Sequence, residues 1–242
     1  MRRLVDRLKP RLRTLPFFGA LRFVYRFPCD SNFRRAWRLQ RRHPDTLFQP
    51  AGYTVADRYP LVFRFARETL GAERPLRLLS FGCSTGEEVF TLRRYFPAAF
   101  IKGIDIDSVS IARCNEHRGG DRNVAFAVAH STAGEESGSY DAIFCMAVLR
   151  HGALTNPAAE RCDEFIRFED FERTVADFAR CLKPGGLLAL RFSNFRFRDT
   201  DAAHSFKCLL RARPNASTPV FGRDNRRLAA PTEEEVVFRK RG

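Results

Sequence analysis

Apolar and polar positions alternate in blocks through the middle of the chain. Five short apolar runs are typical of buried strands: Leu76–Phe81, Phe100–Ile106, Val124–Val128, Tyr140–Val148 and Leu187–Phe192. Three segments between them place apolar residues at helical spacing: Glu87–Phe96, Ser108–Glu116 and Phe168–Leu182. Strands and helices in this alternation predict a parallel sheet with right-handed crossovers and helices on both of its faces.

The two ends of the chain follow a different pattern. Near the C-terminus, Thr218–Phe221 and Val236–Phe238 are rich in β-forming residues and are predicted to be closing strands. We expect residues 1–70 to be a mostly helical segment that caps the sheet, and residues 71–242 to form the sheet domain. The predicted fold is α/β, Rossmann-like and doubly wound, with a mainly parallel sheet and an N-terminal helical cap.

The first 27 residues mix leucines, arginines and aromatic residues. Leu4, Leu8, Leu12 and Leu15 recur at helical spacing, and Pro10 predicts a break near it. Aromatic residues then gather over residues 17–27. Two interpretations stay open: helices that pack on the body of the protein, or a helix at a membrane interface.

Charge separates the N-terminal segment from the rest of the chain. The net charge is +14, of which +11 falls in residues 1–42, where Asp6 and Asp30 are the only acids. A basic segment of this kind is typical of a surface for nucleic acid, anionic lipid or an acidic protein. A solvated face without a partner is the alternative, because only five of the 42 basic residues are Lys and the arginine bias can reflect genome composition.

Several classes of protein are excluded. No apolar run approaches the roughly 18–20 residues that a transmembrane helix needs. Arg22 and Arg26 interrupt the N-terminal apolar stretch, which disfavours a secretory signal. Seven widely spaced cysteines without a C-x-x-C pair indicate a reducing compartment and no zinc site. We therefore expect a cytoplasmic protein without a metal. Peripheral attachment to a membrane stays open as an alternative within that location.

The loop after the first predicted strand carries the clearest chemical signal. It reads Ser80-Phe81-Gly82-Cys83-Ser84-Thr85-Gly86-Glu87-Glu88 and joins a strand to a helix. Glycines there let the backbone approach a ligand, and the helix N-terminus presents free N–H groups. The loop lacks the Gly-Lys-Ser/Thr of a phosphate-binding loop and does not match G-x-G-x-x-G. Glu87 and Glu88 would repel a pyrophosphate and suit a ligand with a sulfonium or an amino group.

The second predicted strand ends in a carboxylate that completes a nucleoside site. Asp105 follows this loop by about 20 residues, where a carboxylate can accept both hydroxyl groups of an adenosine ribose. With the segments Tyr140–Met146 and Leu182–Gly186, these motifs resemble, in order, those of the class I S-adenosylmethionine-dependent methyltransferases. The resemblance covers about residues 75–193.

Within that superfamily, the loop and Phe144-Cys145 resemble the chemotaxis-receptor glutamate methyltransferases most. Ser80 stands where the generic motif has an acid, and Ser84 replaces its middle glycine, as it does in the chemotaxis-type loop. Met146-Ala147 stand where that family continues with Arg-Asn, and Asp57-Arg58-Tyr59-Pro60 substitutes only loosely for its Phe-Phe-Arg motif. Methyl transfer is therefore expected, rather than methylation of a receptor.

The resemblance implies a set of residues that bind S-adenosylmethionine. Asp105 would hold the ribose and Ile106 would pack on the adenine. Glu87 would face the amino group, or would only be an acid favoured by the helix dipole. The complete set of expected cofactor residues is Gly82, Cys83, Ser84, Thr85, Gly86, Glu87, Asp105, Ile106, Cys145 and Met146.

Candidates for binding and activating the acceptor follow the fourth and fifth strands. His151 is a candidate general base, with a structural role as the alternative. Arg150 is a candidate for binding an acidic group of the substrate. The residues expected to line the acceptor site are Tyr59, Arg150, Ser193 and Asn194. The expected function is methyl transfer to a small-molecule or protein acceptor; the alternative is a nucleic-acid-directed methyltransferase, or a protein that binds nucleic acid or a membrane surface through residues 1–42.

Overall fold

The computed structural model describes residues 18–44, 46–50, 52 and 54–242. The chain divides into two compact units, Met1–Pro44 and Asp45–Gly242. The expected leucine stripe and the break at Pro10 lie outside the described residues. In the described part of the chain, no helix is long and apolar enough to cross a membrane.

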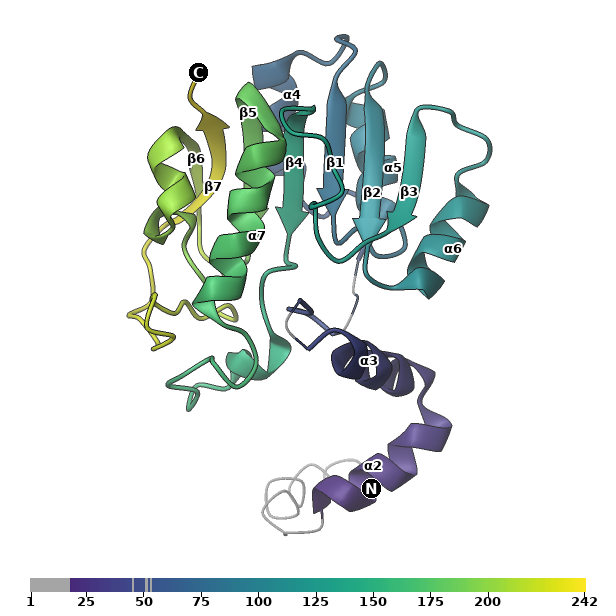
Figure 1. Cartoon of the computed structure of the whole chain (residues 1–242), viewed down its shortest axis with the longest axis vertical. Coiled ribbons are helices and arrows are strands. Elements are labelled where there is room, and N and C mark those ends of the chain that lie inside the picture. Colours follow the sequence, from purple (N-terminus) through teal and green to yellow (C-terminus); the bar gives the residue numbers. More distant parts are fainter. Residues whose placement is uncertain (1–17, 45, 51, 53) are drawn as a thin grey trace. The chain divides into compact units, whose positions relative to one another are not determined.

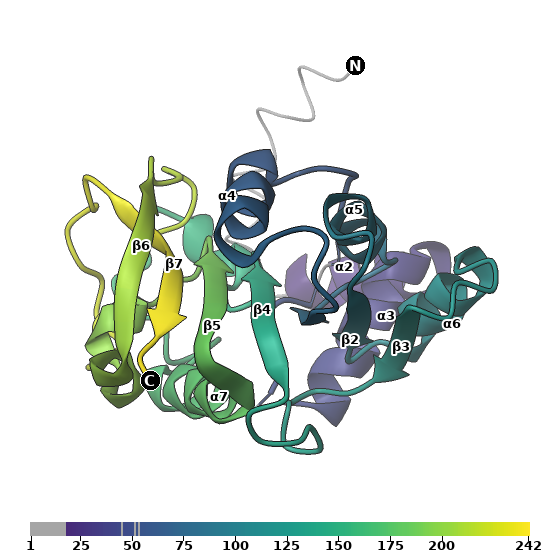
Figure 2. The same cartoon turned by 90° about the horizontal axis from the view of Figure 1, so that it is seen from above.

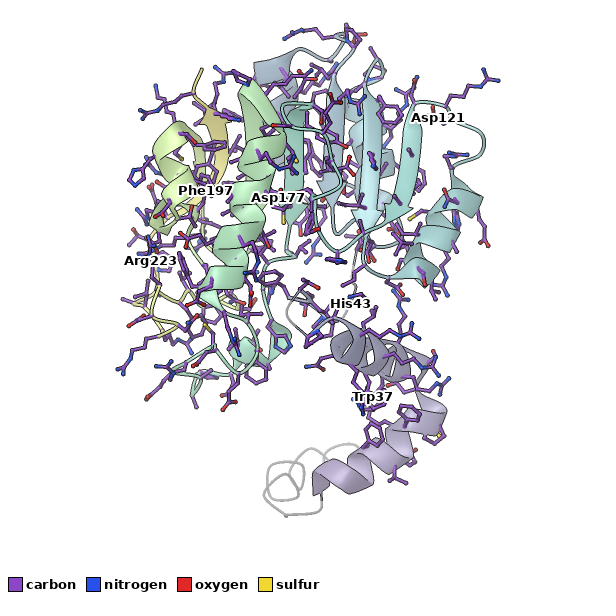
Figure 3. The ribbon with its side chains drawn as sticks, in the orientation of Figure 1. Trp37, His43, Asp121, Asp177, Phe197 and Arg223 are labelled. Carbon is purple, nitrogen blue, oxygen red and sulfur yellow. The ribbon has the colours of Figure 1, made fainter. Side chains whose placement is uncertain are left out.

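Residues 18–44, the described part of the first unit, contain two helices, α2 (Phe18–Cys29) and α3 (Ser31–Arg42). Asp30 caps α3, because its carboxylate accepts a hydrogen bond of 2.9 Å from the Phe33 amide. The aromatic residues pack on one another: Trp37, labelled in Figure 3, lies 5.6 Å from Phe23 and 5.2 Å from Phe27 between ring centroids. Within this unit, the aromatic spacing thus forms a small core between two helices.

The second unit is built on one sheet of seven strands (Figure 1). The strands are β1 (Arg77–Phe81), β2 (Phe100–Asp105), β3 (Val124–Val128), β4 (Tyr140–Met146), β5 (Leu182–Arg191), β6 (Phe206–Ala212) and β7 (Glu234–Lys240). Their order is β3-β2-β1-β4-β5-β7-β6. Strands β1 to β5 are parallel, whereas β7 is antiparallel to both β5 and β6. The predicted Rossmann-like fold is confirmed.

Helices cover both faces of this sheet (Figure 2). They are α4 (Pro60–Leu70), α5 (Glu87–Tyr95), α6 (Ser108–His117) and α7 (Phe168–Cys181), with short 3-10 turns η1 (Gly152–Thr155), η2 (Phe197–Asp199) and η3 (Asp201–Ser205). Side chains at successive positions of a strand enter opposite cores. Leu78 packs with residues of α4, α5 and α6, whereas Leu79 packs with residues of α7. Helix α4, expected in the N-terminal segment, belongs to the second unit.

The C-terminal strands differ from the prediction. The prediction of a strand at Thr218–Phe221 was wrong. Within this segment only Phe221 forms isolated bridges, to Phe195 and Arg227. Instead, Phe206–Ala212 forms β6 at the edge of the sheet, and the segment around Val236–Phe238 forms β7, as predicted. Because β7 runs antiparallel to β5, the N-terminus of β7 lies at the edge where the parallel strands end.

Candidate active site

The loop after β1 is held against β2 by its backbone. The amides of Gly82 and Cys83 donate to the Ile104 carbonyl at 2.8 and 3.0 Å. Gly82 has a φ of +73°, and a Cβ added there would lie 2.5 Å from the Val148 side chain. Gly86, with a φ of +93°, is the N-cap of α5, so only glycine suits either position. The predicted glycine loop therefore brings its backbone to the carboxyl edge of the sheet.

Asp105, at the end of β2, is hydrogen-bonded to this loop. Its Oδ2 accepts a hydrogen bond of 2.8 Å from the Ser84 amide, and its Oδ1 accepts one of 2.9 Å from the Asp107 amide. The residue stays partly exposed at the end of β2. The neighbouring Asp107 has a separate task, since it caps α6 by accepting from the Val109 and Ser110 amides.

The two glutamates that begin α5 lie in different surroundings. Glu87 accepts a hydrogen bond of 2.7 Å from the Thr85 hydroxyl, and Glu88 accepts one of 2.7 Å from the Ser80 hydroxyl. Burial raises the pKa of Glu88 to about 7, although the Ser80 hydrogen bond opposes this shift. The sequence predicted that both acids suit a positively charged ligand, but it placed only Glu87 opposite the amino group. The signal for Glu88 was Ser80 itself, because a polar residue within the buried strand β1 requires a partner.

The fourth strand brings buried thiol and thioether groups to the same edge. Cys145 and Met146 end β4, and both are buried. Burial raises the pKa of the Cys145 thiol well above its ordinary range, as does the nearby Glu88 carboxylate. Cys145 therefore stays protonated near neutral pH. Ile106 follows β2 directly and is partly exposed beside Asp105, as an adenine platform requires.

His151 has a structural task in this geometry. Its Nδ1 accepts a hydrogen bond of 3.3 Å from the Ala153 amide and so caps η1. The ring stacks on Phe165 with centroids 4.8 Å apart, and burial lowers its pKa below 6.5. The imidazole is therefore neutral near pH 7, and the lone pair that a general base needs is already engaged.

Ser193 and Asn194 tie the chain after β5 to the chain after β4. The Ser193 hydroxyl donates to the Leu149 carbonyl at 3.1 Å. The Asn194 side chain accepts from the His151 amide at 2.7 Å and donates to the Pro219 carbonyl at 2.6 Å. Asn194 is 1% exposed, so its role in this geometry is to join three segments at the carboxyl edge. Ser193 stays partly exposed at that edge.

A cluster of buried polar atoms lies beyond the ends of β4 and β5. Among the described residues, five buried side-chain atoms lack a hydrogen-bond partner: Tyr59 Oη, Arg150 Nε, Arg191 Nε, Glu234 Oε2 and Arg239 Nε. Arg239 does not belong to the cluster, because it pairs in register with Leu187, away from the carboxyl end of β5. Arg150 and Arg191 both act electrostatically on the Tyr59 phenol, and Arg191 faces Glu234 at 3.7 Å. Arg150 also donates to the Thr218 hydroxyl at 3.0 Å. Native proteins seldom leave buried polar atoms unpaired, so this cluster is a candidate ligand site.

The predicted acceptor residues Tyr59 and Arg150 thus come together, joined by Arg191 and Glu234, which sequence analysis missed. Burial raises the pKa of Tyr59 to about 12, so the phenol is a donor at neutral pH. Burial and the nearby Arg58 guanidinium lower the pKa of Arg150. Within the described residues, no group of three or more His, Cys, Asp or Glu side chains is placed to hold a metal ion.

Comparison with known proteins gives matches for the sheet domain. Residues 79–190 match the family described as a methyltransferase domain. The chain is 30% identical over 173 residues to ribosomal RNA small subunit methyltransferase C of Hahella chejuensis, a match over 69% of this chain and 46% of the relative. It is 29% identical over 143 residues to an uncharacterized protein of Synechococcus sp.. The chain spans less than half the length of these relatives, 46% and 30%.

Solved structures of similar fold include two methyltransferases. One is a phosphoethanolamine N-methyltransferase of Haemonchus contortus, 19% identical with a TM-score of 0.42 over 58% of this chain and 29% of that chain. The other is a geranyl diphosphate C-methyltransferase of Streptomyces coelicolor, 17% identical with a TM-score of 0.40 over 54% and 44%. Residues 79–190, the segment that matches the methyltransferase domain, extend from β1 to β5 of the Rossmann-like sheet.

Proposed function

We propose that this protein transfers a methyl group from S-adenosylmethionine to a carboxylate oxygen of a small molecule. The observation that carries the proposal is the group of buried atoms without a hydrogen-bond partner on Tyr59, Arg150 and Arg191, which we call the donor cluster. All three groups are donors, two of them permanently charged, and an anionic oxygen would satisfy them. Glu234 limits the charge of the cluster, because it faces Arg191.

The cofactor would lie along the ends of β1, β2 and β4. Asp105 would hold the ribose, Ile106 would contact the adenine, and the backbone of Gly82, Cys83 and Gly86 would line the methionine end. The remaining expected contacts are Ser84, Thr85, Glu87, Cys145 and Met146. Glu88, with a pKa of about 7, is a second candidate partner for the amino group, because a nearby ammonium favours its ionised form.

A carboxylate acceptor fits the chemistry of the side chains at this edge. A carboxylate lone pair attacks the methyl carbon, the carbon–sulfur bond breaks, and its electron pair stays on sulfur as a neutral thioether; no proton moves. The protein has to align oxygen and methyl carbon at about 3–3.5 Å and exclude water. The engaged Nδ1 of His151 and the protonated phenol of Tyr59 argue against an acceptor that must first lose a proton.

The resemblance of the β1 loop to the chemotaxis-receptor glutamate methyltransferases supports the same class of acceptor group. The resemblance rests on the loop from Gly82 to Glu88 and on Phe144-Cys145. The chain after Cys145 departs from that family, since Met146-Ala147 replace its Arg-Asn. The loop and the donor cluster therefore support a carboxylate as the acceptor group, but they do not support a receptor protein as the substrate.

Transfer of a labelled methyl group tests this function. The protein is incubated with methyl-labelled S-adenosylmethionine and a panel of carboxylic acids, amines and phenols. We expect label only in the acids, in a form that mild alkali releases as methanol, because esters hydrolyse and N-methyl or C-methyl groups do not. Calorimetry with S-adenosylhomocysteine verifies the cofactor site. Alkali-stable label, or label only in the amines or phenols, would exclude the carboxylate acceptor.

The basic N-terminal segment supports a second, nucleic-acid-directed function. In α3, Arg38, Arg41 and Arg42 are exposed, and arginine suits phosphate recognition better than lysine. Arg34 is different, since it donates to the Phe27 and Pro28 carbonyls. The similarity to a relative named as a ribosomal RNA methyltransferase points to RNA rather than lipid. We infer that this segment binds RNA phosphates and so sets where the enzyme works.

We expect the affinity for single-stranded RNA to fall steeply with salt. Replacing Arg38, Arg41 and Arg42 by alanine should reduce the log–log salt slope by about 2 to 3, since each neutralised phosphate contributes about 0.7–0.9. Filter binding over a salt series measures the slope, with the exposed triple variant R161A/R223A/R226A as the matched control. An unchanged slope in the α3 variant would refute RNA binding by this segment. Sedimentation of the intact protein with anionic vesicles, but not with RNA, would assign the segment to a membrane surface.

A further inference from the structure

A cavity lies beside the donor cluster, at the far end of the carboxyl edge. It contains about 540 Å³ of free space, part of it open to solvent. Its apolar walls come from Leu190, Phe195, Phe197 and Val220, with Ser193 and Thr218 as polar members.

Two residues connect this cavity to the donor cluster. Thr218 lines the cavity and accepts the hydrogen bond from Arg150. Glu234 lines it as well, accepts a hydrogen bond of 2.5 Å from the Phe192 amide and faces Arg191. Arg150 and Arg191 do not line the cavity themselves, so Thr218 and Glu234 are its two links to the guanidinium groups. The cavity and the donor cluster are therefore neighbours.

The interior of the cavity is suited to an apolar group because its charged residues are paired with one another. Arg196 binds Asp199 at 2.7 Å. Arg211 reaches both Glu233, at 3.8 Å, and Glu235, at 3.1 Å. These ion pairs neutralise the charges at the rim, so the phenylalanine walls dominate what a ligand meets inside.

The wall at Phe197 is firmly supported from behind. Phe197, labelled in Figure 3, lies beside β6 and β7 and packs on Phe206 and Phe238 with ring centroids 5.1 and 4.6 Å apart. Aromatic residues packed edge to face in this way hold a fixed surface. The cavity is therefore a shaped pocket and not a gap that the side chains would close.

Nearly all of the cavity lies outside the segment that matches the family. Of its lining residues only Leu190 falls within the matched segment, residues 79–190; the others lie between Ser193 and Glu235. Residues outside the part that holds the cofactor are the expected source of acceptor selectivity. From these observations we infer that the cavity binds the apolar body of the acceptor, an aryl-substituted carboxylic acid whose carboxylate faces Arg150 and Arg191.

This inference rests on the proposed function, because it places the same carboxylate at the same guanidinium groups. The reaction stays balanced: the carboxylate oxygen forms the bond to the methyl carbon, and S-adenosylhomocysteine leaves. The inference adds that the acceptor carries about one aromatic ring, joined to its carboxylate by a short linker. Small acids without such a ring would bind the guanidinium groups alone.

Selectivity between two acids tests the cavity. We expect kcat/KM for 3-phenylpropanoate to exceed that for acetate by at least about 100-fold, because apolar groups in a pocket discriminate by about 10–200-fold per missing methylene. Val220→Phe narrows the cavity and should lower kcat/KM for 3-phenylpropanoate by at least about tenfold, with acetate and S-adenosylhomocysteine unaffected. Ala98→Phe, an exposed position in the turn before β2, is the matched control and should change neither.

Direct binding separates failure of the cavity from failure of the proposed function. Calorimetry of 3-phenylpropanoate with the S-adenosylhomocysteine complex requires no turnover. Binding that Val220→Phe weakens and Ala98→Phe does not would support the cavity even if no ester forms, in which case only the carboxylate chemistry fails. Equal methylation of both acids would overturn the cavity and leave the proposed function standing. Absence of 3-phenylpropanoate binding to the folded complex would also overturn it.

Discussion

Replacing Asp105 by alanine is expected to weaken the binding of S-adenosylhomocysteine by about 100-fold. The wild-type carboxylate would accept two ribose hydroxyl groups, and hydrogen bonds to a charged group contribute about 1.5–3 kcal/mol each. The variant also releases the Ser84 amide, whose 2.8 Å hydrogen bond holds the glycine loop against the end of β2. Both losses act on the same ligand, which makes this the largest effect expected on the cofactor.

Calorimetry of the purified variant measures this loss. Asp163→Ala is a suitable control, because Asp163 pairs with Arg161 at the surface and makes no contact with the loop. Asp105→Asn should bind with intermediate affinity, since the amide keeps one acceptor oxygen. Thermal melting establishes that each variant is folded. An affinity of Asp105→Ala within threefold of wild type would remove Asp105 from the ribose site.

Replacing Arg150 by alanine is expected to lower kcat/KM for the carboxylate acceptor by about 100- to 1,000-fold, since truncating one partner of a buried charged pair costs about 2–5 kcal/mol. The affinity for S-adenosylhomocysteine should stay within about twofold, because Arg150 is not among the residues expected to bind the cofactor. Arg150→Lys should recover only part of the activity, as an ammonium group cannot reproduce the planar fork of donors that a guanidinium offers a carboxylate.

Steady-state kinetics with the labelled-methyl assay measure this effect. Arg161→Ala removes an exposed guanidinium outside the cluster and should leave kcat/KM unchanged. A rise in KM with constant kcat would indicate that Arg150 only binds the acceptor, whereas an equal fall in kcat and kcat/KM would indicate that it aligns the carboxylate in the transition state. Wild-type kcat/KM in Arg150→Ala would refute its place in the acceptor site.

The glycine loop and the carboxylate beside it could be predicted because their signals are local. A buried strand, two glycines and a helix start lie within one stretch of sequence, and Asp105 follows at the end of the next strand. Positive φ angles at Gly82 and Gly86 then leave little choice of residue. The sheet itself followed from apolar runs that each fill both cores. These features depend on neighbours in sequence, which a single chain displays.

Of the candidate acceptor site, Tyr59 and Arg150 were predicted, but Arg191 and Glu234 were not, because their contacts join distant segments. Glu234 meets Arg191 only after β7 pairs with β5, and no spacing in the sequence announces that pairing. Thr218–Phe221 has strand-forming residues but no partner strand, so it stays a loop that Asn194 and Arg150 hold. His151 has the right residue type for a base, yet its Nδ1 is used to cap a turn.

The antiparallel addition of β6 and β7 has a consequence for how such an enzyme can change. The residues expected to hold the cofactor lie within residues 82–146, whereas most of the cavity lies within residues 193–235. In the proposed function, the donor and the recipient of the methyl group would thus be bound by consecutive, almost separate stretches of the chain. Substitutions or insertions after β5 can redirect the enzyme to a new metabolite without disturbing its supply of methyl groups, so diversification of this lineage should concentrate there.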